Sequence, residues 1–302
     1  MPHSDSLSRS QSGSQSRSQP GSRPVYRFCF GVAAGVLSGF ALEAMPAQAA
    51  AFSFSGSRLT LDTVSGLPET KASTLGTDAI AQTQQGSADN FFDGNLAFVA
   101  DESTRLDGLF ETRSLGNGDG YFGQSHIAAN AFAEFLVTPA QPFALNFQFS
   151  SLLQNVVDTV FERATAKSSV SLSLLDPNQT VLQFFTLDAS VNTSPVDQQS
   201  NEALFVNTNG QILNSNQQLL PGTHQETGNI SFAGSFAHSV SQPTLLTLQV
   251  TTANQSCIQA PIDSATCAKV PDNSGVLPFA LVTALGLLFI PRLRNSSGIA
   301  GS

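Results

Sequence analysis

The sequence predicts an all-β protein built on an antiparallel β-sandwich or jelly-roll-like domain. The first evidence is strict alternation in residues 143–149, where Phe143, Leu145, Phe147 and Phe149 would share one face of a strand. The second is the segment 169–174, which alternates in the same way and leads through Asp176-Pro177-Asn178 into residues 181–187, so a hairpin is expected there. The third is the regular spacing of short apolar segments between turn residues, which is typical of sandwiches, jelly rolls and barrels.

Further strands are expected wherever short apolar or alternating segments are bounded by Gly, Pro, Asn or Asp. They cover residues 52–54, 58–61, 97–99, 131–137, 203–206, 230–236 and 245–250. One segment also fits a helix, because its apolar residues recur at helical spacing: Leu152, Leu153, Val156, Val157, Val160 and Phe161. A single local helix therefore remains an alternative over residues 152–161.

Residues 1–49 have the three parts of a secretory signal peptide. A basic, Ser-rich leader precedes an apolar core at residues 28–42, and Ala47-Gln48-Ala49 provides a cleavage site for signal peptidase. The leader has too little apolar surface to fold and is expected to be disordered. The apolar core has about 15 residues and would span roughly 22 Å as a helix, less than the ~30 Å of a bilayer core. Cleavage after Ala49 is expected, with an uncleaved anchor as the alternative.

Residues 50–269 are expected to form one β domain with an acidic surface. The segment contains seven basic and nineteen acidic residues, a net charge of about −12, whereas the whole chain carries −9. This acidity argues against nucleic acid as a partner, because nucleic-acid binding needs a basic face.

Residues 270–302 are expected to be a C-terminal sorting tail. The segment begins with Val270-Pro271-Asp272-Asn273-Ser274-Gly275, continues with an apolar run at residues 276–290 and contains Arg292 and Arg294. Arginines after an apolar segment favour the cytoplasmic side of a membrane, which leaves the preceding domain outside. A short transmembrane helix is expected over the apolar run. The alternative is a buried strand or helix of the globular domain, since about 15 residues are fewer than the ~20 of a comfortable span.

This tail resembles the sorting signals of PEP-CTERM and, more closely, VPDSG-CTERM proteins of biofilm-forming Gram-negative bacteria. The resemblance implies recognition of Val270, Pro271, Asp272 and Gly275 by an exosortase-type membrane protease, followed by removal of the tail at the cell surface. The chain departs from the pattern where Asn273 interrupts the motif, in having two arginines, and in extending to Ser302. Residues 135–139 and 230–236 also resemble strand motifs of a secreted domain that carries such tails, which supports a β-sandwich.

Catalytic motifs are not recognisable in the sequence. Gly-x-Ser-x-Gly and His-Glu-x-x-His patterns are absent, and three histidines remain after processing: His126, His224 and His238. A pair of glycosidase carboxylates remains an alternative among the dense acids of one segment: Asp89, Asp93, Asp101, Glu102, Asp107 and Glu111. Sequence spacing does not identify such a pair, because the fold sets the separation of the two carboxyl groups.

Calcium is an alternative to a domain without any cofactor, since carboxylate and amide oxygens lie beside glycines in two segments that resemble loops. The candidate ligands are Asp89, Asp93, Asn117 and Asp119. Ordinary turn chemistry explains the same residues, so a domain without any cofactor is expected.

Two more features concern the exported domain. Cys257 and Cys267 are the cysteines left after removal of the leader, and an even count in an oxidising compartment favours a disulfide over free thiols. Four aromatic residues lie in segments that resemble loops near the acids and are candidates for stacking against a sugar: Phe91, Phe92, Tyr121 and Phe122. Rings buried beneath a loop are the alternative.

These observations favour an exported, surface-sorted, non-enzymatic protein associated with an extracellular polysaccharide or biofilm matrix. A secreted carbohydrate-active enzyme and a permanently membrane-anchored surface protein are the alternatives.

Overall fold

A computed structural model describes residues 51–63, 66–100, 104–195 and 202–261 of the chain. They belong to the compact unit Ala41–Ser302, and the other unit, Met1–Phe40, lies outside the described residues. The same holds for every residue expected to be processed, for Asp101 and Glu102, and for Cys267. Within the described ranges no helix is long and apolar enough to cross a membrane.

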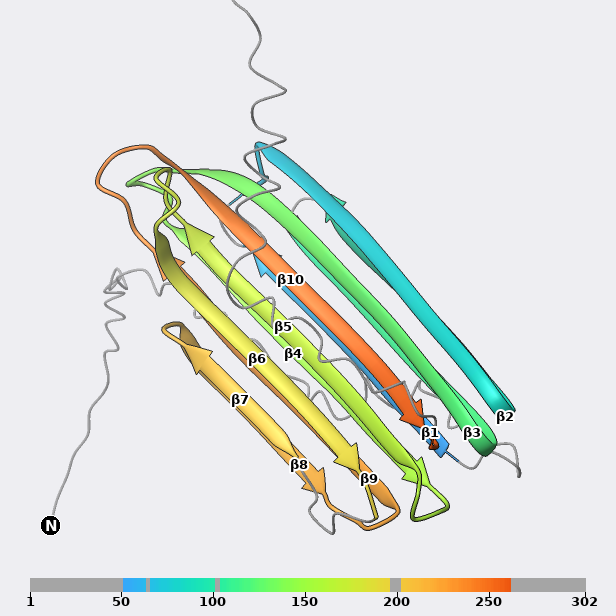
Figure 1. Cartoon of the computed structure of the whole chain (residues 1–302). Coiled ribbons are helices and arrows are strands. Elements are labelled where there is room, and N and C mark those ends of the chain that lie inside the picture. Colours follow the sequence, from blue (N-terminus) through green and yellow to red (C-terminus); the bar gives the residue numbers. More distant parts are fainter. Residues whose placement is uncertain (1–50, 64–65, 101–103, 196–201, 262–302) are drawn as a thin grey trace, which may run out of the picture. The chain divides into compact units, whose positions relative to one another are not determined.

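The described residues form ten β-strands (Figure 1), which confirms the all-β class. Their bounds are β1 Ala51–Thr63, β2 Thr70–Ala100, β3 Thr104–Val137, β4 Phe143–Val157, β5 Arg163–Leu175, β6 Val181–Thr193, β7 Ala203–Thr208, β8 Gln211–Leu220, β9 Gln225–His238 and β10 Thr244–Gln259. All pairings are antiparallel and join the strands into one sheet, in the order β7-β6-β5-β10-β3-β1-β4-β9-β8, with β2 beside β3.

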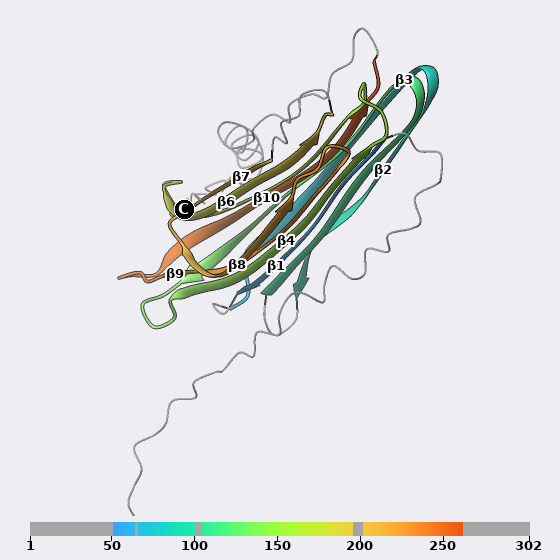
Figure 2. The ribbon, with the colours of Figure 1, turned by 90° about the horizontal axis from the view of Figure 1, so that it is seen from below.

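β2 and β3 form one long hairpin that folds back on itself (Figure 2). The part of β3 before residue 117 pairs with β1, and the part after residue 121 pairs with β10. β2 follows β3 through the bend, with register shifts at Gln85 and Gly86. Gly86 and Gly118 have φ angles of 146° and 104° there, a backbone conformation that glycine adopts without a steric penalty. The bend therefore depends on these two glycines.

The bend turns the sheet into two halves that face each other around one interior. One half contains β1, β4, β9 and β8, and the other contains β10, β5, β6 and β7. On the side opposite the bent hairpin, Asn209 and Gly210 carry the chain from β7, beside β6, to β8, beside β9. The antiparallel sheet is therefore nearly closed.

Large apolar side chains fill most of the interior. Phe147 of β4 contacts Phe185 of β6 and Phe236 of β9, with ring centroids 4.8 and 5.6 Å apart, and all three rings are almost completely buried. Burying a Phe side chain contributes about 1.5–3 kcal/mol. The strand expected at residues 143–149 therefore presents the predicted face to the core.

Small polar side chains line another section of the interior. Ser53 and Ser55 of β1 donate to the carbonyl oxygens of Thr165 and Lys167 in β5, at 2.7 and 2.5 Å. Cα atoms of β1 come within 8 Å of those of β5 and β10, strands on the opposite half of the sheet. Packed sheet faces are ordinarily about 10 Å apart, so small side chains permit an unusually close approach here.

The structure confirms the hairpin expected around residue 176. Asp176 lies between β5 and β6, and its Oδ1 accepts hydrogen bonds from the backbone N–H groups of Asn178 and Thr180, both at 2.8 Å. These backbone donors stabilise the carboxylate and lower the pKa of Asp176.

Two local expectations are wrong. The helix considered for residues 152–161 is instead the end of β4, in which every second side chain is buried, followed by a turn. Segment 89–95 lies within β2, and segment 116–120 lies at the bend of β3, so neither is a loop. β8 also forms a strand that the sequence did not predict, because its composition is polar and lacks alternation.

Candidate functional site

The candidate binding surface is the outer face of β2, β3 and β1 on one half of the sheet. In β3, Phe110, Thr112 and Ser114 are completely buried on the inner face, so the intervening residues point outward. The register of β2 and β3 places their partners on the same side. The outward residues that carry charge or an aromatic ring are Asp89, Phe91 and Asp93 of β2, Arg105, Asp107, Glu111 and Arg113 of β3, and Phe52, Phe54, Arg58 and Asp62 of β1. We refer to this set as the outer acidic face.

Four of the six acids predicted from the sequence therefore share one surface. Asp93 of β2 lies directly opposite Glu111 of β3. Cβ atoms of directly opposed residues are about 4.5–5.5 Å apart, so these two carboxyl groups form the closest pair that the register produces among these acids. Asp101 and Glu102 lie outside the described residues.

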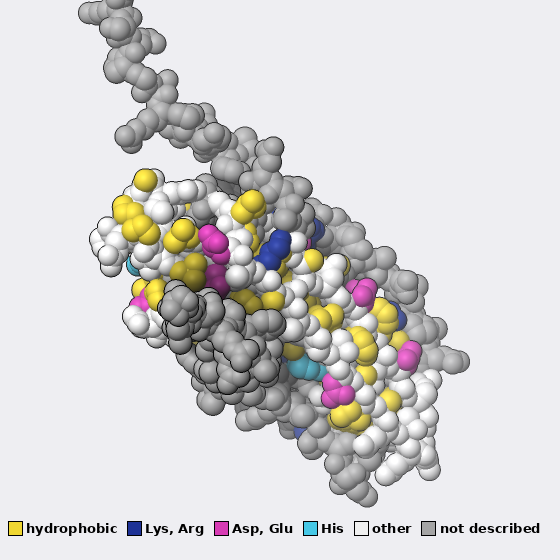
Figure 3. Space-filling view, turned by 90° about the horizontal axis from the view of Figure 1, so that it is seen from above, with side chains coloured by type: hydrophobic (Ala, Val, Ile, Leu, Met, Phe, Trp, Pro, Cys, Tyr) yellow, Lys and Arg dark blue, Asp and Glu magenta, His cyan; other side chains and the backbone are white. Residues whose placement is uncertain are grey.

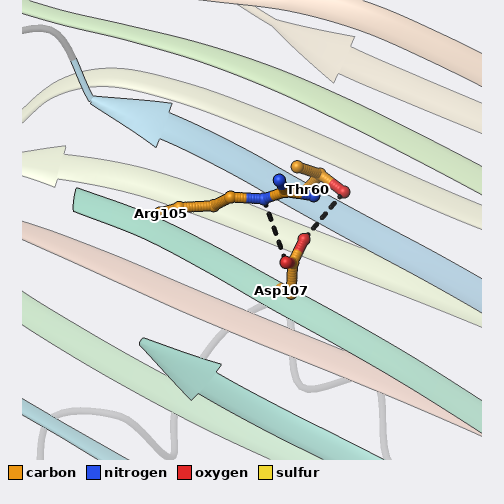
Figure 4. A network of polar contacts seen from close by, with 3 residues as sticks. All are labelled: Thr60, Arg105 and Asp107. Carbon is orange, nitrogen blue, oxygen red and sulfur yellow. Dashed lines mark hydrogen bonds and ion pairs between the residues drawn. The ribbon is translucent and has the colours of Figure 1, made fainter. Parts of the chain in front are cut away.

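Asp107 is held in place by two neighbours, as Figure 4 shows. Its Oδ2 lies 2.9 Å from Nε of Arg105, and its Oδ1 accepts a hydrogen bond from Thr60 of β1 at 3.2 Å. Both charged side chains are partly exposed, so the ion pair contributes only about 0–1 kcal/mol to stability. Its main effect is to orient Asp107 on the outer acidic face.

Phe91 is the exposed aromatic residue of this face. The residue is 41% exposed, and the guanidinium carbon of Arg113 lies 5.3 Å from the ring centroid, within the range of a cation–π interaction. Arg113 is directly opposite Phe91 in the register, so the two strands position the pair. An open ring beside hydrogen-bonding groups is suited to stacking against a sugar.

The other three aromatic candidates do not belong to this surface. Phe92 is 39% exposed, but as the neighbour of Phe91 in a strand it points to the opposite side of the sheet. Tyr121 and Phe122 are buried, so the expectation that they form an exposed patch is wrong. Tyr121 donates a hydrogen bond to Glu162 at 2.8 Å, and burial is the main reason that its pKa is raised.

The four predicted calcium ligands do not converge on one position. Asp89 and Asp93 lie four residues apart in β2, about 13 Å along an extended strand. Asn117 and Asp119 lie at the bend of β3, where both are exposed. Within the described ranges no group of three or more His, Cys, Asp or Glu residues could hold a metal ion. Calcium binding by these residues stays a prediction.

The described histidines lie on different strands or turns. His126 of β3 is directly opposite Asp78 of β2, and burial lowers the pKa of the imidazole while the neighbouring carboxylate raises it. His224 precedes β9, where it interacts with Thr223 at 3.1 Å, and His238 ends the same strand.

Cys257 is disulfide-bonded, and its expected partner, Cys267, lies outside the described residues. In β10 it pairs with Gln124 of β3 and Thr165 of β5, both on the outer side of the sheet. Cys257 itself is completely buried. The pairing with Cys267 stays a prediction.

The visible surface has few charges. Figure 3 shows one side of the molecule on which uncharged polar and backbone atoms predominate, with scattered hydrophobic side chains and isolated acidic ones. Sequence reasoning located the acids of the outer acidic face, but it did not pair Arg113 with Phe91, because only the β2–β3 register brings them together. It also missed the buried Glu226, whose pKa is raised to about 7, mainly by burial.

Comparison of the chain with protein-family models, curated proteins and solved structures found no match.

Proposed function

We propose that this chain is an exported, surface-sorted protein whose β-sandwich or jelly-roll-like domain binds extracellular polysaccharide of a biofilm matrix without chemically changing it. The observation that carries the binding role is Phe91, an exposed ring held beside Arg113 on the outer acidic face. Sugars present C–H groups that pack on such rings and hydroxyl groups that hydrogen-bond to neighbouring carboxylates.

The disulfide at Cys257 supports export. Disulfides persist in secreted and surface proteins and are rare in the reducing cytoplasm. A signal peptide ending at Ala49 and a sorting tail beginning at Val270 agree with that compartment. Signal peptidase and an exosortase-like protease are the processing partners in this proposal, and the C-terminal helix anchors the protein transiently.

The binding role is tested with a polysaccharide pull-down. Phe91→Ala should weaken retention about 2- to 10-fold, which corresponds to the ~0.5–1.5 kcal/mol of an aromatic contact. Phe205→Ala is the matched control, because Phe205 is 58% exposed but lies on β7 at the other side of the sheet. Equal retention of the two variants would remove Phe91 from the binding surface.

The sorting role is tested in the native host. Replacing Val270, Pro271 and Asp272 together should leave export intact and cause a longer, membrane-associated form to accumulate. Intact-mass measurement of the surface and medium fractions distinguishes this form from the mature chain. If the wild-type protein itself retains Ser302 and needs detergent for extraction, a permanent anchor is the better description.

A secreted carbohydrate-active enzyme is the second candidate, favoured by the direct opposition of Asp93 and Glu111. Retaining glycosidases use two carboxyl groups about 5–5.5 Å apart. New reducing ends that appear with the wild type, disappear in Glu111→Gln and persist in Asp89→Asn would support this activity. Binding without any release of product supports the non-enzymatic role.

A further inference from the structure

Four oxygen-bearing side chains gather in the interior at one end of the sheet, three from strands β4, β6 and β9 and one from the residue that precedes β7. Asn155 of β4 and Glu226 of β9 are directly opposite each other in the register, and their exposed fractions are 0% and 1%. Thr193 of β6 donates from its hydroxyl to Oε2 of Glu226 at 3.0 Å across the interior. Two halves of the sheet thus contribute to one buried polar cluster.

Glu202 is the fourth member of this cluster. It immediately precedes β7, in which Leu204 and Val206 pack against the core, so alternation points Glu202 inward as well. Its charge acts on Glu226 and raises the pKa of that carboxyl, after the larger effect of burial. The two glutamates are therefore close enough to repel each other when both are ionised.

Two oxygen atoms of the cluster are buried without a hydrogen-bond donor. They are Oδ1 of Asn155 and Oε1 of Glu202. The amide nitrogen of Asn155 is fully used, since it donates to the carbonyl oxygens of Ala164 and Val191 at 3.0 and 2.8 Å. These bonds fix the amide so that its oxygen is left as an acceptor. A buried hydrogen-bond acceptor without a donor destabilises the folded state by about 1–3 kcal/mol, so a cation bound to these oxygens would remove this cost.

We propose a calcium-binding site at this end of the sheet, formed by the side-chain oxygens of four residues: Asn155, Thr193, Glu202 and Glu226. All four donors are hard oxygens without a nitrogen or sulfur ligand, the set that calcium and magnesium prefer over zinc or copper. Two carboxylates, which can bind in mono- or bidentate fashion, an amide oxygen and a hydroxyl provide four to six ligands, and water completes the six to eight that calcium takes. Calcium tolerates irregular geometry better than magnesium does.

The ion would act by joining the two halves of the sheet. Asn155 and Glu226 belong to one half, whereas Thr193 and Glu202 belong to the half that contains β6 and β7. A divalent cation between them neutralises the two carboxylates and cross-links the halves. This site is distinct from the outer acidic face and does not depend on polysaccharide binding.

The test uses the purified full chain, freed of metal with a chelator and then titrated with calcium chloride in a calorimeter. Glu226→Gln and Glu202→Gln should each raise the dissociation constant at least tenfold, and calcium should raise the melting temperature of the wild type more than that of either glutamine variant. Asp89→Asn is the matched control, because it removes a carboxylate from the outer acidic face, and it should bind as the wild type does.

Three results would overturn the proposal. They are a wild type that binds no calcium, glutamine variants that bind it as tightly as the wild type, and loss of binding in Asp89→Asn alone, which would place the ion on the outer face. Circular dichroism of each variant shows whether it is folded. If Glu226→Gln does not fold, Glu202→Gln decides the question, because Glu202 lies at the margin of the cluster, outside the paired strands.

Discussion

Asn254 is the residue whose replacement should most damage the polar section of the interior. It lies on β10, is 1% exposed and makes four hydrogen bonds. Its Oδ1 accepts from the hydroxyls of Ser57 and Ser168 at 3.0 and 2.9 Å, and its Nδ2 donates to the carbonyl oxygens of Ser55 and Phe110 at 3.2 and 3.0 Å. One amide therefore connects β10 to β1, β3 and β5.

The expected cost of Asn254→Ala follows from that geometry. A typical intramolecular hydrogen bond contributes about 1 kcal/mol net, so loss of four bonds should lower the free energy of unfolding by about 4 kcal/mol. In urea, with a slope of about 2.5 kcal/mol per molar, the unfolding midpoint should fall by about 1.6 M. The matched control is Asn216→Ala on the exposed strand β8, which should change stability by less than about 0.5 kcal/mol.

A second substitution at the same position distinguishes the contribution of the amide oxygen from that of the amide nitrogen. Asn254→Asp keeps the oxygen that accepts from the two serines but places a second oxygen against the carbonyls of Ser55 and Phe110. Burial and these carbonyls should raise the pKa of the introduced carboxyl, so the variant should lose stability as pH rises above about 4, the unfolded value. The reasoning is refuted if Asn254→Ala and Asn216→Ala have the same midpoint, or if Asn254→Asp shows no such pH dependence relative to the wild type.

Three other predictions concern the bend and the two buried acids. Gly118→Ala should lower the free energy of unfolding, measured in urea, by about 1–3 kcal/mol or more. The reason is that φ of Gly118 is 104° and a Cβ atom would lie 2.6 Å from the carbonyl oxygen of Gln85. An unchanged unfolding midpoint would contradict the bend at Gly118. Tyr121→Phe should lower the free energy of unfolding, measured by thermal unfolding, by about 1.5–3 kcal/mol, since it removes the hydroxyl that donates to the buried Glu162. Unchanged stability would show that a water molecule replaces the tyrosine hydroxyl. In the presence of a chelator, the free energy of unfolding of the wild type should increase by up to about 3 kcal/mol as pH falls from 7 to 4.5. The reason is that the pKa of Glu226 in the folded state is raised to about 7, so the folded protein takes up a proton at higher pH than the unfolded chain does. Glu226→Gln should lack this pH dependence, and identical pH profiles of the two proteins would show that Glu226 does not titrate in this range.

The sequence by itself determined the all-β class, the inward face of β4 and the β5–β6 hairpin. In these places the apolar period of two and the turn residues at 176–178 are local signals, and the fold follows them. It also located Asp93 and Glu111 in one acidic region, which the structure places on one face.

Sequence reasoning failed where local pattern and burial disagree. In β4, Ser151 and Asn155 point inward, whereas the apolar Leu152 and Val156 point outward, so the segment imitates a helical repeat. The small polar residues are buried because the two halves approach closely and offer carbonyl oxygens as partners, as Ala164 and Val191 do for Asn155. A local sequence pattern does not reveal hydrogen-bond partners that are distant in the chain.

Only the tertiary structure decided the bend of β2 and β3 and the residues that it brings together. Gly86 and Gly118 look like ordinary turn residues in the sequence, but they fold a long hairpin so that it pairs with β1 on one half and β10 on the other. The cluster of Asn155, Thr193 and Glu226 likewise joins strands that are distant in the chain. The physical reason is that antiparallel register and the closing of a sheet are set by hydrogen bonds and packing between remote segments, which no short stretch of sequence specifies.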